Sequence, residues 1–223
     1  MPSETVEEYL ETIFKLAEKA DVRPGMLATE LGVAAPTVTA TLRRLESHGL
    51  VTRTDDGGVV LTDGGRRTAI DIIRRHRIAE RFLVDSLGLP WDEVHEEACR
   101  LEHALSPRVL EALEAFLKGP HSCPHGHPIP AADGTVAELT GDPLAVCAVG
   151  DDTTIVRIDD EDADLLGYLS SLGMLPGEHV RICEFAPFSG PLLVEVGASR
   201  YAIGRDVASK IVVTSDAAAG TRK

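Results

Sequence analysis

The stretch LGVAAPTVTATLRRLESHGLVTRTDDGGVVLT, residues 31–62, decides how the N-terminal part of the chain folds. Its central run, residues 35–48, predicts an amphipathic helix, with Pro36 near the first turn and Gly49 directly after the end. Two β-rich runs follow and flank the turn at residues 55–58, which indicates a hairpin. A helix followed at once by a β-hairpin is typical of a winged DNA-reading unit.

The residues before this stretch complete the pattern. A short helix is expected over 24–32, so that helix, tight turn, helix and hairpin form a winged helix-turn-helix. The start of the 35–48 helix would enter the major groove, where hydroxyl and apolar groups contact base edges. We expect base contacts from Pro36, Thr37 and Thr39, and phosphate contacts from Arg43, Arg44 and Arg53. The alternative is a helical hairpin without a DNA role.

Composition sets outer limits on function. The 223 residues suffice for one large or two small domains, and their net charge of −14 argues against indiscriminate nucleic-acid binding but not against one locally basic face. No apolar run reaches the roughly 18 residues of a membrane helix, and the acidic start does not resemble a signal peptide. We expect no membrane association and a cytoplasmic location. The four cysteines form no CxxC pair, which disfavours a zinc ribbon.

The rest of the chain predicts a mainly α protein with a small β-barrel. Helices are expected over 3–20, capped by Ser3, and over 64–87, 91–104 and 106–118. Beyond a Pro- and Gly-rich segment, short β-like runs beginning with LAVCAV indicate the barrel, interrupted by a helix over 161–172. The predicted parts are a winged helix-turn-helix domain at 1–63, a helical part at 64–118, a linker at 119–143 and the β-barrel at 144–215.

Metal-capable side chains recur on three of the predicted helices. HEEACRLEH, residues 95–103, places four of them on one face about 100° wide. The 64–87 helix adds a His–Glu pair one turn apart, and the first helix adds two Glu. Each pair alone is ordinary, but their joint occurrence predicts a metal site formed by His95, Cys99, Glu102, His103, His76, Glu80, Glu8 and Glu11.

The Pro-rich segment adds a further motif, SCPHGHP. Residues two apart in an extended chain point the same way, so Cys123 and His125 could reach one ion, whereas His121 and His127 are interpreted as bystanders.

These motifs, in this order, resemble the diphtheria-toxin-repressor family of metal-dependent transcriptional regulators, in its manganese/iron branch. The resemblance covers nearly the whole chain, including EEYLETIFKL, APTVTATLRRLESHGLV and HGHPIP, and the last third resembles the family's SH3-like domain, which is similar to ferrous-transport accessory proteins. It implies a homodimer that binds a palindromic DNA operator, with a divalent metal as co-repressor. It also implies that residues 64–118 are a helical dimerisation and metal-binding domain and that 144–215 are an SH3-like domain.

The resemblance also implies two metal sites per subunit. The primary site would use Glu8, Cys99, Glu102 and His103, with Glu11 or His76 nearby. The ancillary site would use His76, Glu80 and His95, and in members with the Cys-Pro-His segment Cys123 and His125 join Glu80 together with an acid from the barrel. Asp160 stands at the matching place.

The choice of metal depends on two of these positions. Iron-type members carry Met where this sequence has Glu8, whereas manganese-type members carry an acid there but often a carboxylate in place of Cys99. Carboxylate and imidazole suit Mn(II), and a thiolate favours softer ions. Mn(II) is therefore favoured, Fe(II) is the alternative, and Co(II), Zn(II) or Cd(II) would act as surrogates.

Two other function classes compete with this interpretation. A metalloenzyme would need a base and an oxyanion-stabilising group beside the ion, and the sequence offers no such motif, so we expect no enzyme activity. A metal buffer or metal-transport accessory protein would not need the DNA-reading helix.

Overall fold

The computed structural model describes residues 3–215. The chain forms two compact units. Within the described residues, the first comprises 3–76, 102–105 and 130–135, and the second comprises 77–101, 106–129 and 136–215. The helix α4 (Asp63–Leu87) begins in the first unit and ends in the second.

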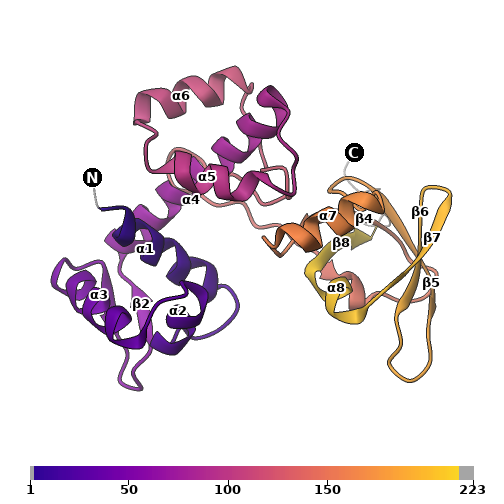
Figure 1. The fold of residues 1–223 in the computed structure, drawn as a ribbon, viewed down its shortest axis with the longest axis horizontal. Helices are drawn as coiled ribbons and strands as arrows, with labels where there is room; N and C mark the ends of the chain where they lie inside the picture. Colours follow the sequence, from indigo (N-terminus) through magenta and orange to yellow (C-terminus); the bar gives the residue numbers. More distant parts are fainter. Residues whose placement is uncertain (1–2, 216–223) are drawn as a thin grey trace. The chain divides into compact units, whose positions relative to one another are not determined.

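The first unit is a winged helix-turn-helix, as predicted. Its elements are α1 (Glu4–Ala17), α2 (Pro24–Glu30), α3 (Ala35–Ser47), β1 (Val51–Arg53), β2 (Val59–Leu61) and the start of α4. The two strands pair antiparallel, with Val51 opposite Leu61. The helix α1 contacts α2 and β2, while α3 contacts α2 and β1 (Figure 1).

Apolar residues at helical spacing build the core of this unit. Leu10 and Ile13 of α1 are fully buried, as are Val38, Leu42 and Leu45 of α3. This burial removes one face of each helix from water, which is the main source of their stability in a folded chain.

Two details define the ends of these helices. A Cβ on Gly65 would lie 1.9 Å from the Leu50 carbonyl oxygen. Only glycine therefore allows the start of α4 to pack this closely against the backbone between α3 and β1. Gly49 has a φ of +68°, which suits glycine directly after a helix. Ser3 is the N-cap residue of α1, as predicted, but its side chain makes no capping hydrogen bond.

The second unit contains the rest of α4, most of α5 (Val94–Glu102) and α6 (Pro107–Phe116). Ser106 caps α6, because its side chain accepts a hydrogen bond from the Val109 amide. Phe82 of α4 packs edge-on against Phe116 of α6, with their ring centroids 6.1 Å apart. The irregular chain that follows, around residues 120–129, is also part of this unit.

A six-stranded antiparallel sheet completes the second unit. Its strands are β3 (Asp142–Pro143), β4 (Asp152–Ile158), β5 (His179–Phe185), β6 (Leu192–Val196), β7 (Ser199–Ile203) and β8 (Ile211–Ser215), in the spatial order β3-β8-β4-β5-β6-β7. Within residues 3–215 the edge strands β3 and β7 do not pair, so the predicted small barrel takes the form of an open sheet. Irregular register between β4 and β8, and between β5 and β6, bends the sheet.

Three helical segments accompany these strands. The run predicted as a first strand, LAVCAV, instead opens with the 3-10 turn η1 (Leu144–Val146). The helix α7 (Ala163–Ser171) was expected, whereas the short helix α8 (Arg205–Lys210) was not. The helix α8 contacts η1, β3 and β8 (Figure 1). Side chains from the strands, η1, α7 and α8 share one core, formed among others by Leu144, Ile155, Leu166, Ile182, Val194 and Ala208.

None of the helices within residues 3–215 combines the length and apolarity that a bilayer crossing requires.

Candidate metal centres

The first unit contains a set of ionisable side chains that we call the N-terminal cluster. Its members are Glu7, Glu11, His76 and Glu102, which are buried, and His103, which is partly buried. They come from α1, from α4 and from the segment 102–105. Helical spacing in α1 brings Glu7 and Glu11 to one buried face, one turn apart. Arg75 of α4 lies against the cluster, with its Nη1 atom 3.6 Å from Glu7 Oε1.

A buried triad forms the centre of this cluster. Glu11, His76 and Glu102 each offer one ligand atom, and these atoms lie within 4.8 Å of one another. Glu102 is 1% exposed, and its Oε2 atom lies 2.6 Å from His76 Nδ1. Burial raises the pKa of Glu102, and the nearby Glu11 carboxylate adds to this effect while His76 opposes it. Two carboxylates therefore face each other in a site that water does not solvate.

An outer triad lies at the rim of the same cluster. Glu4, Glu8 and His103 also place ligand atoms within 4.8 Å of one another, but Glu4 and Glu8 are exposed. Burial lowers the pKa of His103, but its hydrogen bond to Glu7 and the charge of Glu102 outweigh this, and the net shift is upward.

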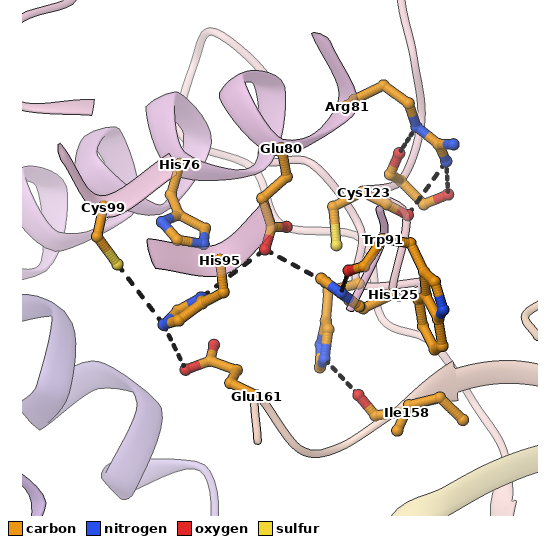
Figure 2. A network of polar contacts seen from close by, with 12 residues as sticks. His76, Glu80, Arg81, Trp91, His95, Cys99, Cys123, His125, Ile158 and Glu161 are labelled. Atoms are coloured by element: carbon orange, nitrogen blue, oxygen red, sulfur yellow. Dashed lines mark hydrogen bonds and ion pairs between the residues drawn. The ribbon is translucent and has the colours of Figure 1, made fainter. Parts of the chain in front are cut away.

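The second unit contains what we call the loop cluster: Glu80 of α4 with Cys123 and His125 of the irregular chain. All three are buried, and their ligand atoms lie within 4.8 Å of one another. Glu80 Oε1 lies 3.2 Å from His125 Nδ1. Figure 2 shows Glu80 between His95 and His125, with Cys123 beside it.

Arginines of α4 hold the irregular chain in place. Arg81 donates from Nε to the Ser122 carbonyl at 3.0 Å and from Nη2 to the Cys123 carbonyl at 3.1 Å. Arg77 donates to the Pro128 carbonyl at 2.5 Å. These guanidinium groups donate to backbone carbonyls of the irregular chain, and the Cys123 carbonyl also accepts from the Gly126 amide at 3.0 Å. Together these hydrogen bonds fix the position of the cysteine and the histidine.

The sheet also contacts this chain. The Ile158 amide of β4 donates to the His125 carbonyl at 3.0 Å, and His127 Nε2 lies 3.0 Å from the Ile158 carbonyl. Gly126 has a φ of +91°, and a Cβ there would lie 2.1 Å from the Val156 carbonyl. Only glycine permits this close approach.

His95 connects the loop cluster to an acid from the sheet region. The His95 Nδ1 atom lies 3.8 Å from Glu80 Oε1. Its Nε2 atom lies 3.4 Å from Glu161 Oε2 and 3.5 Å from the Cys99 sulfur. The acid expected here was Asp160. Asp160 instead lies 2.5 Å from Lys210 Nζ and accepts from the Asp162 amide at 2.9 Å, so its carboxylate has other partners.

The electrostatics of the loop cluster depend on its burial. Burial raises the pKa of the Cys123 thiol, and the neighbouring Glu80 carboxylate raises it further. Burial lowers the pKa of His125, but the hydrogen bond and charge of Glu80 outweigh this and the net shift is upward. A cation would relieve both effects, because it stabilises a thiolate and replaces a proton on imidazole.

Both clusters have the chemistry of a divalent-metal site. Each combines carboxylate and imidazole donors at buried positions, and the loop cluster adds a thiol. In the N-terminal cluster, the buried carboxylates of Glu11 and Glu102 lie close together, which is unfavourable unless a cation neutralises them. In both clusters the donor atoms are near enough to one another, within 4.8 Å, to bind a single ion.

The predicted ligands divide between the two units. Glu8, Glu11, His76, Glu102 and His103 belong to the first, and Glu80, His95, Cys99, Cys123 and His125 belong to the second. Three acids near these sets were not predicted: Glu4, Glu7 and Glu161. The i, i+4 spacing of Glu7 and Glu11 was a usable signal for Glu7, whereas the acidic run 159–162 gave no means of choosing among its members.

The predicted DNA-reading residues lie on the outside of the first unit. Pro36, Thr37, Thr39, Arg43 and Arg44 of α3 are all exposed. Arg53 differs, because its Nε lies 3.0 Å from Glu46 Oε1, so a phosphate would compete with this pair. At the wing tip, hydrogen bonds from Thr54 and then Arg23 lower the pKa of Asp56 to about 2.

Sequence comparisons match three parts of the chain to known families. Residues 1–59 match the iron-dependent repressor N-terminal DNA-binding domain, 62–131 match the iron-dependent repressor metal-binding and dimerisation domain, and 143–215 match the FeoA domain. The iron-dependent repressor IdeR of Mycobacterium tuberculosis is 37% identical over 228 residues, covering 94% of this chain and 96% of its own length. The diphtheria toxin repressor of Corynebacterium diphtheriae is 42% identical over 132 residues, covering 58% of each chain.

Among solved structures, a manganese-dependent transcriptional repressor in complex with manganese superposes with a TM-score of 0.88. It is 39% identical and covers 94% of this chain and 99% of its own.

Proposed function

Because the chain belongs to the diphtheria toxin repressor family of metal-dependent transcriptional repressors, we propose that its two buried clusters bind divalent metal and thereby control operator binding by a homodimer. The relatives are repressors by name and not enzymes, and we propose no catalytic role for this chain. A repressor acts on chromosomal DNA, so we place the protein in the cytoplasm.

The observation that carries the proposal is the buried triad of Glu11, His76 and Glu102 in the same unit as the reading helix. When bound there, a divalent cation supplies positive charge that offsets the repulsion between the two carboxylates. Glu11 lies on α1, and His76 lies on α4. Relief of this repulsion holds α1 against α4.

The position of α1 matters for DNA binding because this helix is part of the core of the reading unit. Leu10 and Ile13 are fully buried, and α1 contacts both α2 and β2. A shift of α1 therefore disturbs the packing under α3 and the wing. We propose that the cluster biases an equilibrium between orientations of the reading unit, of which the metal-bound orientation fits DNA.

We propose Mn(II) as the favoured metal and Fe(II) as the alternative. The N-terminal cluster offers carboxylate and imidazole donors, which suit Mn(II). Cys99 and Cys123 favour softer ions, so Co(II), Zn(II) and Cd(II) are expected to serve as surrogates. The Glu8→Met variant is expected to shift the metal preference of operator binding from Mn(II) toward Fe(II).

We propose further that the sites combine residues as the family pattern implies. Glu8, Cys99, Glu102 and His103 form the primary site, with Glu11 or His76 nearby. The ancillary site takes His76, Glu80, His95, Cys123 and His125. We assign its carboxylate from the sheet region to Glu161 and not to Asp160, because Glu161 faces His95 while Asp160 pairs with Lys210.

On DNA, we propose that two copies of α3 read the halves of a palindromic operator. Thr37 and Thr39 would contact base edges and Pro36 thymine methyl groups, while Arg43 and Arg44 would contact phosphates. Residues 64–118 are proposed to form the dimer core.

The test is operator affinity as a function of metal. DNA duplexes selected from a random pool with Mn(II)-loaded protein would be titrated at fixed salt in Mn(II), in Fe(II) under anaerobic conditions, and in chelator. We expect metal to tighten binding about 10- to 100-fold. Glu178→Gln, at an exposed position directly before β5 and outside the proposed dimer core, serves as a control and should behave as the wild type. Equal affinity in metal and in chelator would refute the scheme.

A further inference from the structure

Glu7 stands out in the N-terminal cluster because it is buried although its neighbour Glu8 is exposed. It is 3% exposed, and it belongs to neither of the ligand triads of this cluster. A buried carboxylate is expensive unless its hydrogen-bonding capacity is used. Its partners therefore indicate what it does.

The first partner is a ring nitrogen of a proposed ligand. Glu7 Oε2 lies 2.7 Å from His103 Nδ1, a distance typical of a charge-assisted hydrogen bond. A carboxylate accepts a hydrogen bond, so Nδ1 of His103 carries a proton in this contact. The lone pair of the neutral ring then lies on Nε2.

The other nitrogen of the same ring points toward the proposed ligands. His103 Nε2 lies 3.4 Å from Glu102 Oε1, which belongs to the buried triad. A ring whose Nδ1 is bound to Glu7 thus presents Nε2 on the side where other donors gather. A carboxylate that accepts from the far nitrogen of a metal-binding imidazole fixes its tautomer and makes the ligand nitrogen more basic.

The second partner of Glu7 holds the carboxylate in place. Its Oε1 atom lies 3.6 Å from Nη1 of Arg75, which is buried, and Arg75 is bound in turn to Asp71 one turn earlier on α4. Glu7 is thereby fixed between two elements and has little freedom to rotate into the ligand set itself.

We propose that Glu7 is a positioning residue that fixes His103 with Nδ1 protonated, so that Nε2 is the atom offered to metal. This inference rests on the proposed function, since it assumes that His103 binds the ion. It adds a residue that acts through another ligand and does not touch the metal.

Nuclear magnetic resonance tests the assignment directly. Protein labelled with ¹⁵N in histidine and loaded with Zn(II) or with Cd(II) would be examined by long-range ¹H–¹⁵N correlation. We expect His103 to be protonated at Nδ1 and metal-bound at Nε2. Coordination through Nδ1 would overturn the proposal.

Two variants grade the effect. Glu7→Gln keeps the side-chain length and one acceptor oxygen but loses the charge. Glu7→Met loses both the acceptor oxygen and the charge. Competition with a chelator should show Zn(II) affinity at the N-terminal cluster falling about 10-fold and about 100-fold respectively. In metal-free Glu7→Met the His103 ring should also show mixed tautomers, a change that a purely structural role would not produce. Unchanged affinity and an unchanged tautomer in Glu7→Gln and Glu7→Met would overturn the proposal, and Glu7→Gln alone decides if Glu7→Met does not fold.

The matched control is Glu18→Gln, an exposed glutamate directly after the end of α1. It should leave the Zn(II) affinity of the N-terminal cluster and the tautomer of His103 unchanged. The design separates this inference from the proposed function. If operator binding ignores metal, the function fails while the tautomer result stands. If operator binding needs metal but His103 binds through Nδ1, only the role of Glu7 fails.

Discussion

The N-terminal cluster and the loop cluster each bring three buried donors within 4.8 Å of one another, but they are built from different kinds of chain. Glu11 and His76 lie on long helices of the reading unit, whereas Cys123 and His125 lie on irregular chain that depends on arginines and on β4 for its position. The donors differ as well, since only the loop triad contains a thiol.

This difference separates two tasks. A site that ties one helix to another can change how a whole unit is oriented, so we assign control of operator binding to the N-terminal cluster. A site on irregular chain mainly fixes that chain and the strand against it. The thiol also makes the donor set of the loop cluster softer. We therefore expect the loop cluster to prefer Mn(II) over other divalent ions less strongly than the N-terminal cluster does.

Matched carboxylate variants test this division with the largest expected effect. Glu102→Gln removes a buried charge from the triad of the reading unit, and Glu80→Gln removes the equivalent charge from the loop cluster. We expect Glu102→Gln to weaken Mn(II)-dependent operator binding by on the order of 100-fold and Glu80→Gln by less than about 10-fold. Fluorescence anisotropy of a labelled operator gives both values. The opposite order would assign control to the loop cluster.

The thiol provides the next contrast. Cys123→Ser should lower the Cd(II) affinity of the loop cluster roughly 10- to 100-fold, because a hard hydroxyl replaces a soft ligand, while Mn(II) affinity should change by less than about threefold. Competition titrations with each ion measure the two values. Cys183→Ser, on β5 and a member of neither triad, is the control. Equal losses for both ions would mean that the sulfur is not a ligand of the soft metal.

Much of this architecture could be predicted because it depends on local pattern. The periodicity of 35–48 and the acidic turn at 55–58 predict the reading helix and the wing, and the structure contains both. The run LAVCAV shows the limit of such reasoning. Its apolar residues suit a strand or a short helical turn, and tertiary packing of Leu144 in the sheet core decides for the turn.

The sites were predictable as sets of residues and less so as contacts. His95, Cys99 and Glu102 share a helix face, which the sequence reveals directly. Whether Asp160 or Glu161 faces His95 depends on Lys210, which is distant in sequence and attracts one acid of a continuous run. The burial of Glu7 likewise follows from Arg75 and His103, which no local pattern connects to it.

The pH dependence of stability should have opposite signs in the two regions of the metal-free protein. The raised pKa of His103 adds stability that is complete below pH about 6.5 and is lost as the pH rises through the folded-state value. Burial, with the charge of Arg77, lowers the pKa of His127 to about 4. Stability from the neutral His127 is therefore present above pH about 6.5 and is lost as the pH falls toward 4, by about 3 kcal/mol.

Hydrogen exchange in chelator at pH 5.5 and pH 8, corrected for intrinsic rates, separates these effects. Peptides from α1 should be better protected at the lower pH, and peptides around 122–129 at the higher pH. His127→Gln should remove the second change and leave the first. The same sign in both regions would contradict the comparison.

The smallest expected effect concerns how the loop cluster is held. Arg81 reaches the Ser122 and Cys123 carbonyls with two different nitrogens, and a lysine ammonium cannot reproduce this fork. Arg81→Lys should therefore lower Zn(II) affinity at the loop cluster about three- to tenfold through less precise placement of Cys123, with no change at the N-terminal cluster. Arg181→Lys, at an exposed position on β5, controls for the loss of a guanidinium group. If Arg81→Lys leaves loop-cluster affinity at the wild-type value, irregular chain in this protein does not need its arginines to build a site, and the contrast with the helix-borne cluster is weaker than we argue.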